Sequence, residues 1–562
     1  MKTRTRHGAN EVWFAFPLLL ATAACSSEPA GPESSSNATE AVRAPVEQTE
    51  SAGEAENANR KRLITGEVKR YDYQVDLGSG SVRAALDVRV APPGGTCFSA
   101  ACQADATDAQ WNGRPARSSE LSAGQLLVCG RRVHGGDFLH VGAQAAIPAQ
   151  TFLGLDVGFS RKKDLAGGTF TYLLSWIEGC SHFGVCDPDP SRLAEYHFEV
   201  SHAPGETVLC PGKLSAGASR TRCDLARGHE AGDARALAPT YSSVGVASDP
   251  LWKRNPLLTT NGGLNVVFYE VPGGAIAESL DKPSIREFFD WISGYLGPFP
   301  YGDELRFAGA PTHWLGFEHP ANIVLYEKLQ TVKGAYANPT MHVVMHETTH
   351  QWAGNRATLA SVGDFVWKEA TAEYLSYVFE RDHRPAGEAE ATRAYWDRIS
   401  LLATHHPRPT DEPLPAVQDF YTDVYGPGPM VLYVQLEALI GKDRVLEGIR
   451  SFLARPGARS VDDLREALED ASDADLSDYF DAWVFGKGKP AWPKFDVTTS
   501  QRADGDVVVT VTQSSAAPAL HGCVVEVEVE STTGAKTLAR VNFGLHPSSA
   551  SASTVISLGG GT

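Results

Sequence analysis

The chain has 562 residues, which is too long for a single hydrophobic core, so we expect several domains. Hydrophobic residues make up 42% of it, enough to bury real cores, and this excludes a wholly disordered protein. The 68 acidic residues outnumber the 50 Lys and Arg, which gives a formal net charge of −18. This balance argues against a nucleic-acid partner, because such a protein needs a basic surface to neutralise phosphates.

The chain begins with the pattern of an export signal. Lys2, Arg4 and Arg6 precede the mostly apolar stretch 12–24, which is too short to span a bilayer as a helix. Cys25 follows, and this ending resembles a bacterial lipoprotein signal, in which the cysteine becomes lipidated. Plain secretion after a small-x-small cleavage pattern is the alternative. We therefore expect an outer-membrane or cell-surface lipoprotein that touches the membrane only through this lipid anchor, or otherwise a periplasmic or secreted protein.

The chain contains 9 cysteines, and lipidation of Cys25 would leave an even number, which suits disulfides in an oxidising compartment. Closeness in sequence suggests the pairs Cys97/Cys102, Cys180/Cys186 and Cys210/Cys223, with Cys129 and Cys523 left over. A zinc site made by Cys180, His182 and Cys186 is the less favoured alternative for an exported protein.

Strand signals follow a polar spacer. The residues after the signal are rich in Ser, Ala, Glu, Pro and Asn, and they predict a disordered linker. Apolar residues then alternate with polar ones over 71–77 and 82–90, which predicts strands. Turn-rich sequence with more short strands continues to about residue 270. The first folded module is therefore expected to be an antiparallel β domain.

Helical signals dominate the middle of the chain. Ile285, Phe288 and Ile292 recur at helical spacing, and Ser460 is a suitable N-cap for a second amphipathic segment, 461–471. The tail returns to a period of two, which predicts a small β module at the end.

The residues that indicate chemistry lie in the run Val-Val-Met-His-Glu-Thr-Thr-His-Gln-Trp, which covers 343–352. His346 and His350 are four residues apart, so on a helix both imidazoles project from one face and can bind one ion. Glu347 lies between them, where its carboxylate can serve as a base beside that ion. Two neutral imidazoles, an open position and a neighbouring base suit zinc.

A third ligand strengthens this interpretation. Glu369 follows His350 by 19 residues inside a predicted helix, and two histidines with one glutamate complete a three-ligand zinc site whose fourth position stays open. With this spacing, and with the extended match over 346–355, the chain resembles the gluzincin aminopeptidases, the aminopeptidase N family. The resemblance implies one Zn²⁺ per chain, held by His346, His350 and Glu369, with Glu347 as the catalytic base.

Two nearby residues offer alternatives. His342 is also four residues before His346, but no glutamate lies next to it to act as a base. Glu373 sits one turn after Glu369, so it could replace that ligand, orient a zinc-bound imidazole, or face solvent on the helix surface.

A further segment, Trp-Leu-Gly-Phe-Glu-His-Pro at 314–320, resembles the family's Gly-x-Met-Glu-Asn motif. Three positions depart from the motif, at Leu315, Phe317 and His319, while Glu318 is kept. The resemblance implies that Glu318 binds the substrate's α-ammonium, for which a carboxylate is a suitable counter-charge. The departures leave endopeptidase specificity open as an alternative.

Tyr425 lies 56 residues beyond Glu369 and resembles the family's tyrosine that donates to the oxyanion formed during peptide hydrolysis. The lysine that usually follows this tyrosine is missing here, and Tyr421 is a nearby rival for the role.

These inferences predict a multi-domain α+β protein with a thermolysin-like, mainly helical catalytic domain. Its expected parts are a lipoprotein-type signal peptide (1–25), a disordered linker (26–62), an N-terminal antiparallel β domain (63–272), the zinc catalytic domain (273–488) and a C-terminal β-sandwich-like domain (489–562). The predicted function is a zinc aminopeptidase that acts on peptides. A zinc endopeptidase of the same fold and a catalytically weak surface binding protein are the alternatives, and no oligomeric state is predicted.

Overall fold

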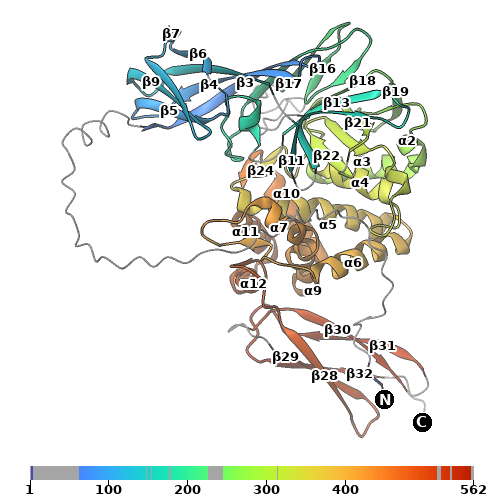
Figure 1. Cartoon of the computed structure of the whole chain (residues 1–562). Helices are drawn as coiled ribbons and strands as arrows, with labels where there is room; N and C mark the ends of the chain where they lie inside the picture. The colour runs from blue at the N-terminus through green and yellow to red at the C-terminus, as the bar shows by residue number, and fades with distance from the viewer. Residues whose placement is uncertain are drawn as a thin grey trace, which may run out of the picture.

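The computed structural model describes residues 2–3 and 63–557, apart from 105, 147–148, 153–154, 176–178, 226–244, 313, 515–519 and 532–533. The predicted signal peptide from residue 4 onward, the lipidation site Cys25 and the predicted linker lie outside the described residues. Figure 1 shows three parts: a β-rich N-terminal arm, a body of helices with a sheet on one side, and a small β module at the opposite end. The predicted fold class is confirmed.

The N-terminal arm is built from three sheets, which the chain assembles largely from antiparallel neighbours. The eight-stranded sheet has the order β16 (Lys213–Ser215), β17 (Arg220–Leu225), β14 (Glu195–Ser201), β3 (Gly66–Asp76), β4 (Ser81–Val90), β10 (Phe138–Ala146), β6 (Ala106–Trp111), β7 (Arg114–Pro115). The four-stranded sheet has the order β2 (Leu63–Ile64), β5 (Gly95–Ala101), β9 (Gln125–Val133), β8 (Ser118–Ser122). The five-stranded sheet has the order β11 (Ala149–Phe152), β12 (Leu155–Lys163), β13 (Thr169–Leu174), β18 (Gly245–Asp249), β15 (Thr207–Leu209), and a short 3₁₀ turn, η1 (Cys180–Phe183), joins the arm.

Alternation of side chains explains the central strands of this arm. Tyr71, Tyr73 and Val75 on β3 are buried, while the intervening side chains point outward. Two pairings differ from the predicted antiparallel pattern, because β14 runs parallel to β3 and β2 runs parallel to β5. A parallel neighbour needs a long crossover, and the chain between β3 and β14 provides one.

The central body contains one mixed sheet with helices against it. Its sheet order is β19 (Lys253–Thr259), β20 (Asn265–Glu270), β21 (Glu304–Ala310), β23 (Asn322–Tyr326), β22 (Gly316–His319). The main helices are α2 (Ile276–Ser279), α3 (Lys282–Leu296), α4 (Pro339–Thr349), α5 (Phe365–His383), α6 (Ala386–Ser400), α7 (Val417–Tyr425), α8 (Pro427–Pro429), α9 (Gln435–Ile440), α10 (Lys442–Leu453), α11 (Val461–Ser472) and α12 (Ser477–Trp483). Short connecting elements are the 3₁₀ turns η2 (Leu329–Thr331) and η3 (Val362–Asp364), the π-helical turn η4 (Met430–Val434), and the strand pairs β24 (Ala357–Leu359) with β26 (Gly457–Arg459) and β25 (Arg408–Pro409) with β27 (Phe485–Gly486).

The C-terminal module consists of two small sheets. One has the order β28 (Lys494–Gln501), β29 (Val507–Ser514), β32 (Ser551–Ile556), and the other has the order β1 (Lys2–Thr3), β30 (Val524–Glu530), β31 (Lys536–Asn542). The indole of Trp483 donates to the Gly522 carbonyl at 2.8 Å, and the Val524 N–H donates to the Gln435 side chain at 3.1 Å. These two bonds tie the module to the helices α9 and α12 of the body.

Three disulfides lie in the N-terminal arm. They join Cys97 to Cys129, Cys180 to Cys186 and Cys210 to Cys223. Two of the predicted pairs are therefore confirmed, but Cys97/Cys102 is wrong. Cys97 and Cys129 lie directly opposite each other on β5 and β9, whereas Cys102 is five residues further along an extended chain, roughly 17 Å away. The second disulfide also contradicts the alternative zinc site at Cys180 and Cys186. Disulfides indicate an oxidising, extracytoplasmic compartment.

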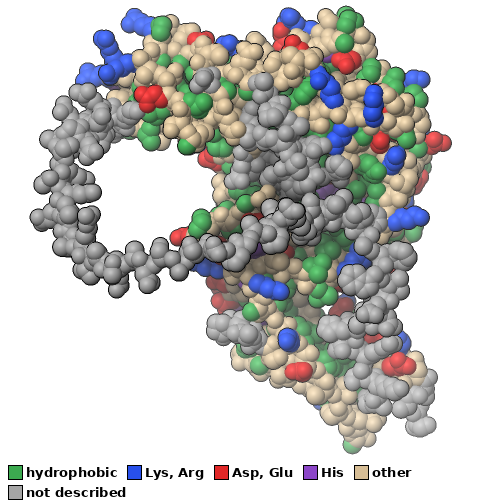
Figure 2. All heavy atoms as spheres, in the orientation of Figure 1, with side chains coloured by type: hydrophobic (Ala, Val, Ile, Leu, Met, Phe, Trp, Pro, Cys, Tyr) green, Lys and Arg blue, Asp and Glu red, His purple; other side chains and the backbone are tan. Residues whose placement is uncertain are grey.

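On the face shown in Figure 2, Lys and Arg side chains lie scattered among apolar and acidic ones instead of forming a continuous basic strip. Within the described part of the chain, no helix is both long enough and apolar enough to cross a membrane.

Candidate zinc site

Helix α4 presents His346 and Glu347, and His350 caps its C-terminal end. The helix begins where the Asn338 side chain accepts a hydrogen bond from the backbone N–H of Met341 at 3.3 Å. Every residue of α4 is buried, so its polar side chains face the interior of the protein. Because residues four apart share one face of a helix, the two imidazoles meet at the same place.

The three predicted zinc ligands converge at one place. The Nε2 atoms of His346 and His350 are 3.0 Å apart, and Oε2 of Glu369 on α5 lies 3.4 Å from the first and 3.3 Å from the second. All three residues are buried. A tetrahedral zinc ion bound at about 2.0–2.1 Å would hold its ligand atoms roughly 3.3 Å apart, which matches these separations. The residues present therefore fit a zinc ion.

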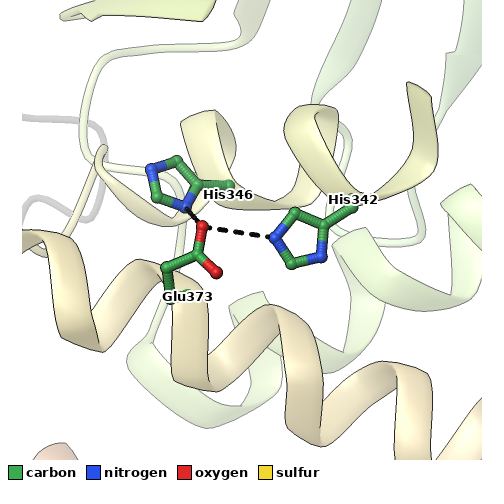
Figure 3. A group of neighbouring side chains, drawn as sticks. All are labelled: His342, His346 and Glu373. Carbon is green, nitrogen blue, oxygen red and sulfur yellow. Dashed lines mark hydrogen bonds and ion pairs between the residues drawn. The ribbon is translucent and has the colours of Figure 1, made fainter. Parts of the chain in front are cut away.

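The outer nitrogen of each imidazole faces a fixed acceptor. Nδ1 of His350 lies 2.9 Å from the Ala353 carbonyl, and Nδ1 of His346 lies 3.1 Å from Oε1 of Glu373. Figure 3 shows this second contact, with the Glu373 carboxylate between His346 and His342. With Nδ1 directed outward in both rings, both Nε2 atoms are directed at the place where an ion would sit.

Glu373 is held by several donors at once. The Tyr336 hydroxyl donates to its Oε1 at 2.9 Å, and the Trp396 indole donates to its Oε2 at 2.7 Å. Burial raises the pKa of the Glu373 carboxyl, but His342 and His346 outweigh this effect and lower its pKa far below the ordinary value. The side chain is 1% exposed, so it is not a surface glutamate. Its contacts are those of a residue that orients an imidazole.

His342 belongs to the same buried network. Its Nδ1 lies 2.8 Å from Glu380 and its Nε2 lies 3.4 Å from Glu373, and its ring stacks on Tyr336 with centroids 3.6 Å apart. Burial lowers the pKa of His342, but the two carboxylates outweigh it and raise the pKa to about 9. The ligand atoms of His342, His346 and Glu373 are close enough to hold an ion. Both oxygens of Glu373, however, already accept from Tyr336 and Trp396, and the other ring nitrogen of His342 faces Glu380. These contacts favour a supporting role for His342 over a ligand role.

Glu347 lies beside the cluster and against the edge strand β22. Burial raises the pKa of its carboxyl to about 8, which Glu318 and Glu369 reinforce and His346 opposes. A Cβ atom at Gly316 would lie 2.3 Å from Oε1 of Glu347, far inside van der Waals contact. Only glycine therefore allows the strand to approach the carboxylate this closely.

Glu318 is joined to the cluster by a buried lysine. Nζ of Lys368 lies 2.6 Å from Oε1 of Glu318 and 2.6 Å from Oε1 of Glu369. Burial raises the pKa of both carboxyls, but Lys368 and His350 outweigh it, so the pKa of Glu318 is lowered and that of Glu369 is lowered well below its ordinary value. Both carboxylates are thus kept ionised next to an ammonium group.

Both candidate tyrosines reach the site. The Tyr425 hydroxyl donates to Oε2 of Glu369 at 2.7 Å, and the Tyr421 hydroxyl lies 2.7 Å from that of Tyr425. Since Tyr425 donates its hydroxyl proton to Glu369, the Tyr421 hydroxyl is the donor in the bond between the two tyrosines. Burial, followed by Glu369 and Tyr421, raises the pKa of Tyr425 well above its ordinary value, so this hydroxyl stays a donor.

Gln351 fixes the strand that carries Glu318 to the helix that carries the histidines. Its Nε2 donates to the His319 carbonyl at 3.2 Å, and its Oε1 accepts from the Ala321 N–H at 2.9 Å. The N-terminal arm supports the same turn, because the Gly212 N–H donates to the Pro320 carbonyl at 2.8 Å. The turn between β22 and β23 is therefore held from both sides.

The structure brings all six predicted site residues into one pocket. They are His346, Glu347, His350, Glu369, Glu318 and Tyr425. Sequence reasoning missed three residues that shape this pocket, namely Gly316, Gln351 and Lys368. The sequence offered one hint for each of them, namely its closeness to a predicted site residue. Gly316 lies two residues before Glu318, Gln351 follows His350 and Lys368 precedes Glu369.

The central part of the chain is similar to known zinc peptidases and aminopeptidases. Residues 318–483 match the model of the peptidase family M1 domain. "Probable aminopeptidase 1" of Sulfurisphaera tokodaii is 25% identical over 210 residues, which are 36% of this chain and 25% of that protein. Aminopeptidase N of Streptomyces lividans is 25% identical over 232 residues, which are 37% of this chain and 27% of that protein. The match thus spans about a quarter of the length of these relatives.

Solved structures resemble the fold over a larger share of the chain. Legionella pneumophila aminopeptidase A in complex with aspartic acid aligns with a TM-score of 0.66 at 16% identity, covering 89% of this chain and 58% of that one. A mutant M1 zinc metallopeptidase from Deinococcus radiodurans, bound to a Tyr-Ser-Ala substrate, aligns with a TM-score of 0.60 at 18% identity, covering 76% of this chain and 96% of that one. Residues 318–483 are thus similar to the peptidase family M1 domain, and the solved structures share the fold of this chain.

Proposed function

We propose that this protein is a zinc-dependent aminopeptidase that removes N-terminal residues from peptides. The observation that carries the proposal is the convergence of two imidazole nitrogens and one carboxylate oxygen at 3.0–3.4 Å from one another, with Glu347 in the same pocket. His346, His350 and Glu369 would hold the ion. Zinc bound there would supply Lewis-acid chemistry, by acidifying a water molecule and polarising the scissile carbonyl.

Glu347 is the general base of the proposed reaction. Its carboxylate accepts a proton from the attacking water and then delivers it to the leaving amine. Burial raises the pKa of its carboxyl to about 8, and a bound cation would lower that pKa and so favour the carboxylate, which is the form that accepts a proton. A group with a pKa near the working pH can both take up and return a proton.

Tyr425 and Glu318 position the substrate. Negative charge develops on the carbonyl oxygen as the tetrahedral intermediate forms, and the Tyr425 hydroxyl, which lies beside Glu369, is placed to donate to it. Glu318 lies on the same pocket wall and offers a negative charge to the α-ammonium of a peptide. Fixing this end of the peptide presents the first peptide bond to the base.

Substitution of Glu347 by Gln tests the proposal. The variant should keep one zinc per chain and lose nearly all turnover, because the isosteric amide cannot accept the proton. A panel of aminoacyl fluorogenic substrates, with and without a chelator, measures this. Substantial activity in the zinc-loaded variant would refute the role of Glu347.

Specificity is tested with matched free and N-acetylated peptides. Preference for the free amine supports an aminopeptidase, and Glu318→Ala should then harm free-amine substrates far more than blocked ones. Equal cleavage of both would indicate the zinc endopeptidase that the departures at Leu315, Phe317 and His319 left open. Zinc binding without turnover on either would indicate a surface binding protein.

We also propose that the protein is exported and anchored through a lipid on Cys25. The basic start, the apolar stretch 12–24 and the three disulfides support this location. Metabolic labelling with a tagged fatty acid should mark the wild-type chain but not Cys25→Ser. Labelling of both, or of neither, would contradict the anchor.

A further inference from the structure

Lys368 is a buried ammonium fixed between two carboxylates. Its side chain is 1% exposed, and its Nζ lies 2.6 Å from both Glu318 and Glu369 and 5.3 Å above the ring of Phe365. The stem passes over Gly354, where φ is +131° and an added Cβ would come within 2.8 Å of Cε of Lys368. Glycine is therefore the residue that fits position 354, because its backbone readily adopts this conformation and its missing side chain leaves room for the lysine stem.

The two oxygens of Glu369 face different partners. Oε1 faces Lys368 at 2.6 Å, while Oε2 faces the Nε2 atoms of His346 and His350. A carboxylate with one oxygen held by an ammonium group presents the other to an ion. Lys368 therefore favours a single oxygen of Glu369 as the ligand.

A second group of possible ligand atoms shares one histidine with the first group. Glu318, Glu347 and His350 also offer ligand atoms that lie within 4.8 Å of one another, and His350 belongs to both groups. A carboxylate oxygen of Glu318 thus lies beside His350, one of the two histidines of the candidate zinc site. A catalytic zinc site uses three protein ligands and keeps the next position open, and an additional carboxylate would close it.

We propose that Lys368 is a positioning residue that holds Glu318 out of the metal's coordination shell and so keeps that position open. The inference rests on the zinc site of the proposed function. The simpler alternative is that Lys368 only balances the charge of two buried carboxylates. The two ideas differ in what loss of Lys368 should do. If Lys368 only balances charge, its loss changes how tightly the metal binds. If it positions Glu318, its loss also changes the number of protein ligands on the metal.

The test uses the full-length protein loaded with Co²⁺, whose visible absorption reports coordination geometry. The variants are Lys368→Met, Glu318→Gln and the double variant K368M/E318Q. We expect Lys368→Met to change the position and intensity of the Co²⁺ bands, because a carboxylate then occupies the position that Lys368 keeps open. Glu318→Gln in the presence of Lys368 should keep the wild-type spectrum, and the double variant should regain it.

Zinc affinity provides a second readout that needs no turnover. In competition with a chelator, the double variant should release Zn²⁺ at least about tenfold more readily than Lys368→Met, because it lacks the extra ligand. A wild-type spectrum in Lys368→Met, or failure of the double variant to regain it, would overturn the proposal.

Lys368→Met leaves two buried carboxylates without their ammonium partner, so its fold is checked by circular dichroism. If it does not fold, the comparison is repeated with Lys368→Gln, alone and together with Glu318→Gln. A changed Co²⁺ spectrum that the second substitution restores supports the proposal, and an unchanged spectrum overturns it. A changed spectrum in Glu318→Gln alone would show that Glu318 already binds the metal, which would also overturn the proposal. Failure of the wild-type protein to bind one metal ion per chain would instead refute the zinc site itself, so the two failures are distinct.

Discussion

Single residues around the histidines set the direction of each imidazole. The Glu373 carboxylate accepts hydrogen bonds from Tyr336 and Trp396 and faces Nδ1 of His346, so it cannot rotate away. A carboxylate behind a ligand imidazole fixes the ring and raises its basicity toward the metal. The surface interpretation that the sequence left open for Glu373 is therefore wrong.

Removing this charge should weaken metal binding. Glu373→Gln keeps the shape of the side chain but not its charge, and we expect zinc affinity to fall by about tenfold or more. Glu380→Gln is the matched control, because Glu380 contacts His342 and not His346, and its effect should be smaller. Chelator competition measures both, and equal losses would contradict the direct role of Glu373.

The two tyrosines form a second residue-scale unit. Tyr425→Phe should lower kcat by on the order of 100-fold while zinc content stays constant, because the proposed donor to the oxyanion is lost. Tyr421→Phe should cost less, since Tyr421 acts through the Tyr425 hydroxyl at 2.7 Å. In the double variant the Tyr421 change should have no further effect, and additive losses would show that the two hydroxyls act independently.

At the scale of elements, the approach of β22 to α4 decides the shape of the pocket. Gln351 bonds to both sides of the turn after β22, and Gly316 lets the strand lie against Glu347. Neither contact is local in sequence. The strand that carries Glu318 is thus positioned by the helix that carries Glu347.

Gly316→Ala should disable the enzyme without removing the metal. The added methyl group would lie 2.3 Å from the Glu347 carboxylate, so either the strand or the base must move, and we expect a large loss of kcat with zinc retained. Gly294→Ala on α3 is the control, because nothing lies within 4 Å of its added Cβ and alanine favours a helix by roughly 0.5–1 kcal/mol. Equal activity of the two variants would contradict the argument.

At the scale of the whole molecule, a buried acid makes stability depend on pH. Asp249 ends β18 in the N-terminal arm and is fully buried, and burial, reinforced by Asp164, raises its pKa to about 7. The unfolded chain releases this proton near pH 4, while the folded chain keeps it until about pH 7. Between these values the unfolded state binds fewer protons, so the contribution of Asp249 to stability is present at low pH and is lost as pH rises.

Asp249→Asn should remove this pH dependence. The amide mimics the protonated acid, so the variant should melt near the wild-type temperature at pH 4 and at a higher temperature above pH 7. The difference should be on the order of 1–2 kcal/mol after allowance for solvent screening. Thermal unfolding across this pH range measures it, and parallel curves for the two proteins would contradict the expectation.

The sequence by itself determined what depends on spacing along one helix or strand. The distance between His346 and His350 places both on one helical face, and the alternation over 71–77 defines a strand, because both patterns follow from backbone periodicity alone. The family resemblance then supplied Glu369, Glu318 and Tyr425, and the structure brings all of them to the same pocket.

Only the tertiary structure decided which distant groups meet. The pairing of Cys97 with Cys129 follows from strand register. The ion pair of Lys368 with Glu318, the approach of Gly316 to Glu347 and the donors around Glu373 join segments that are far apart in sequence. Such contacts depend on how whole elements pack, and the spacing of residues along the chain contains no record of that packing.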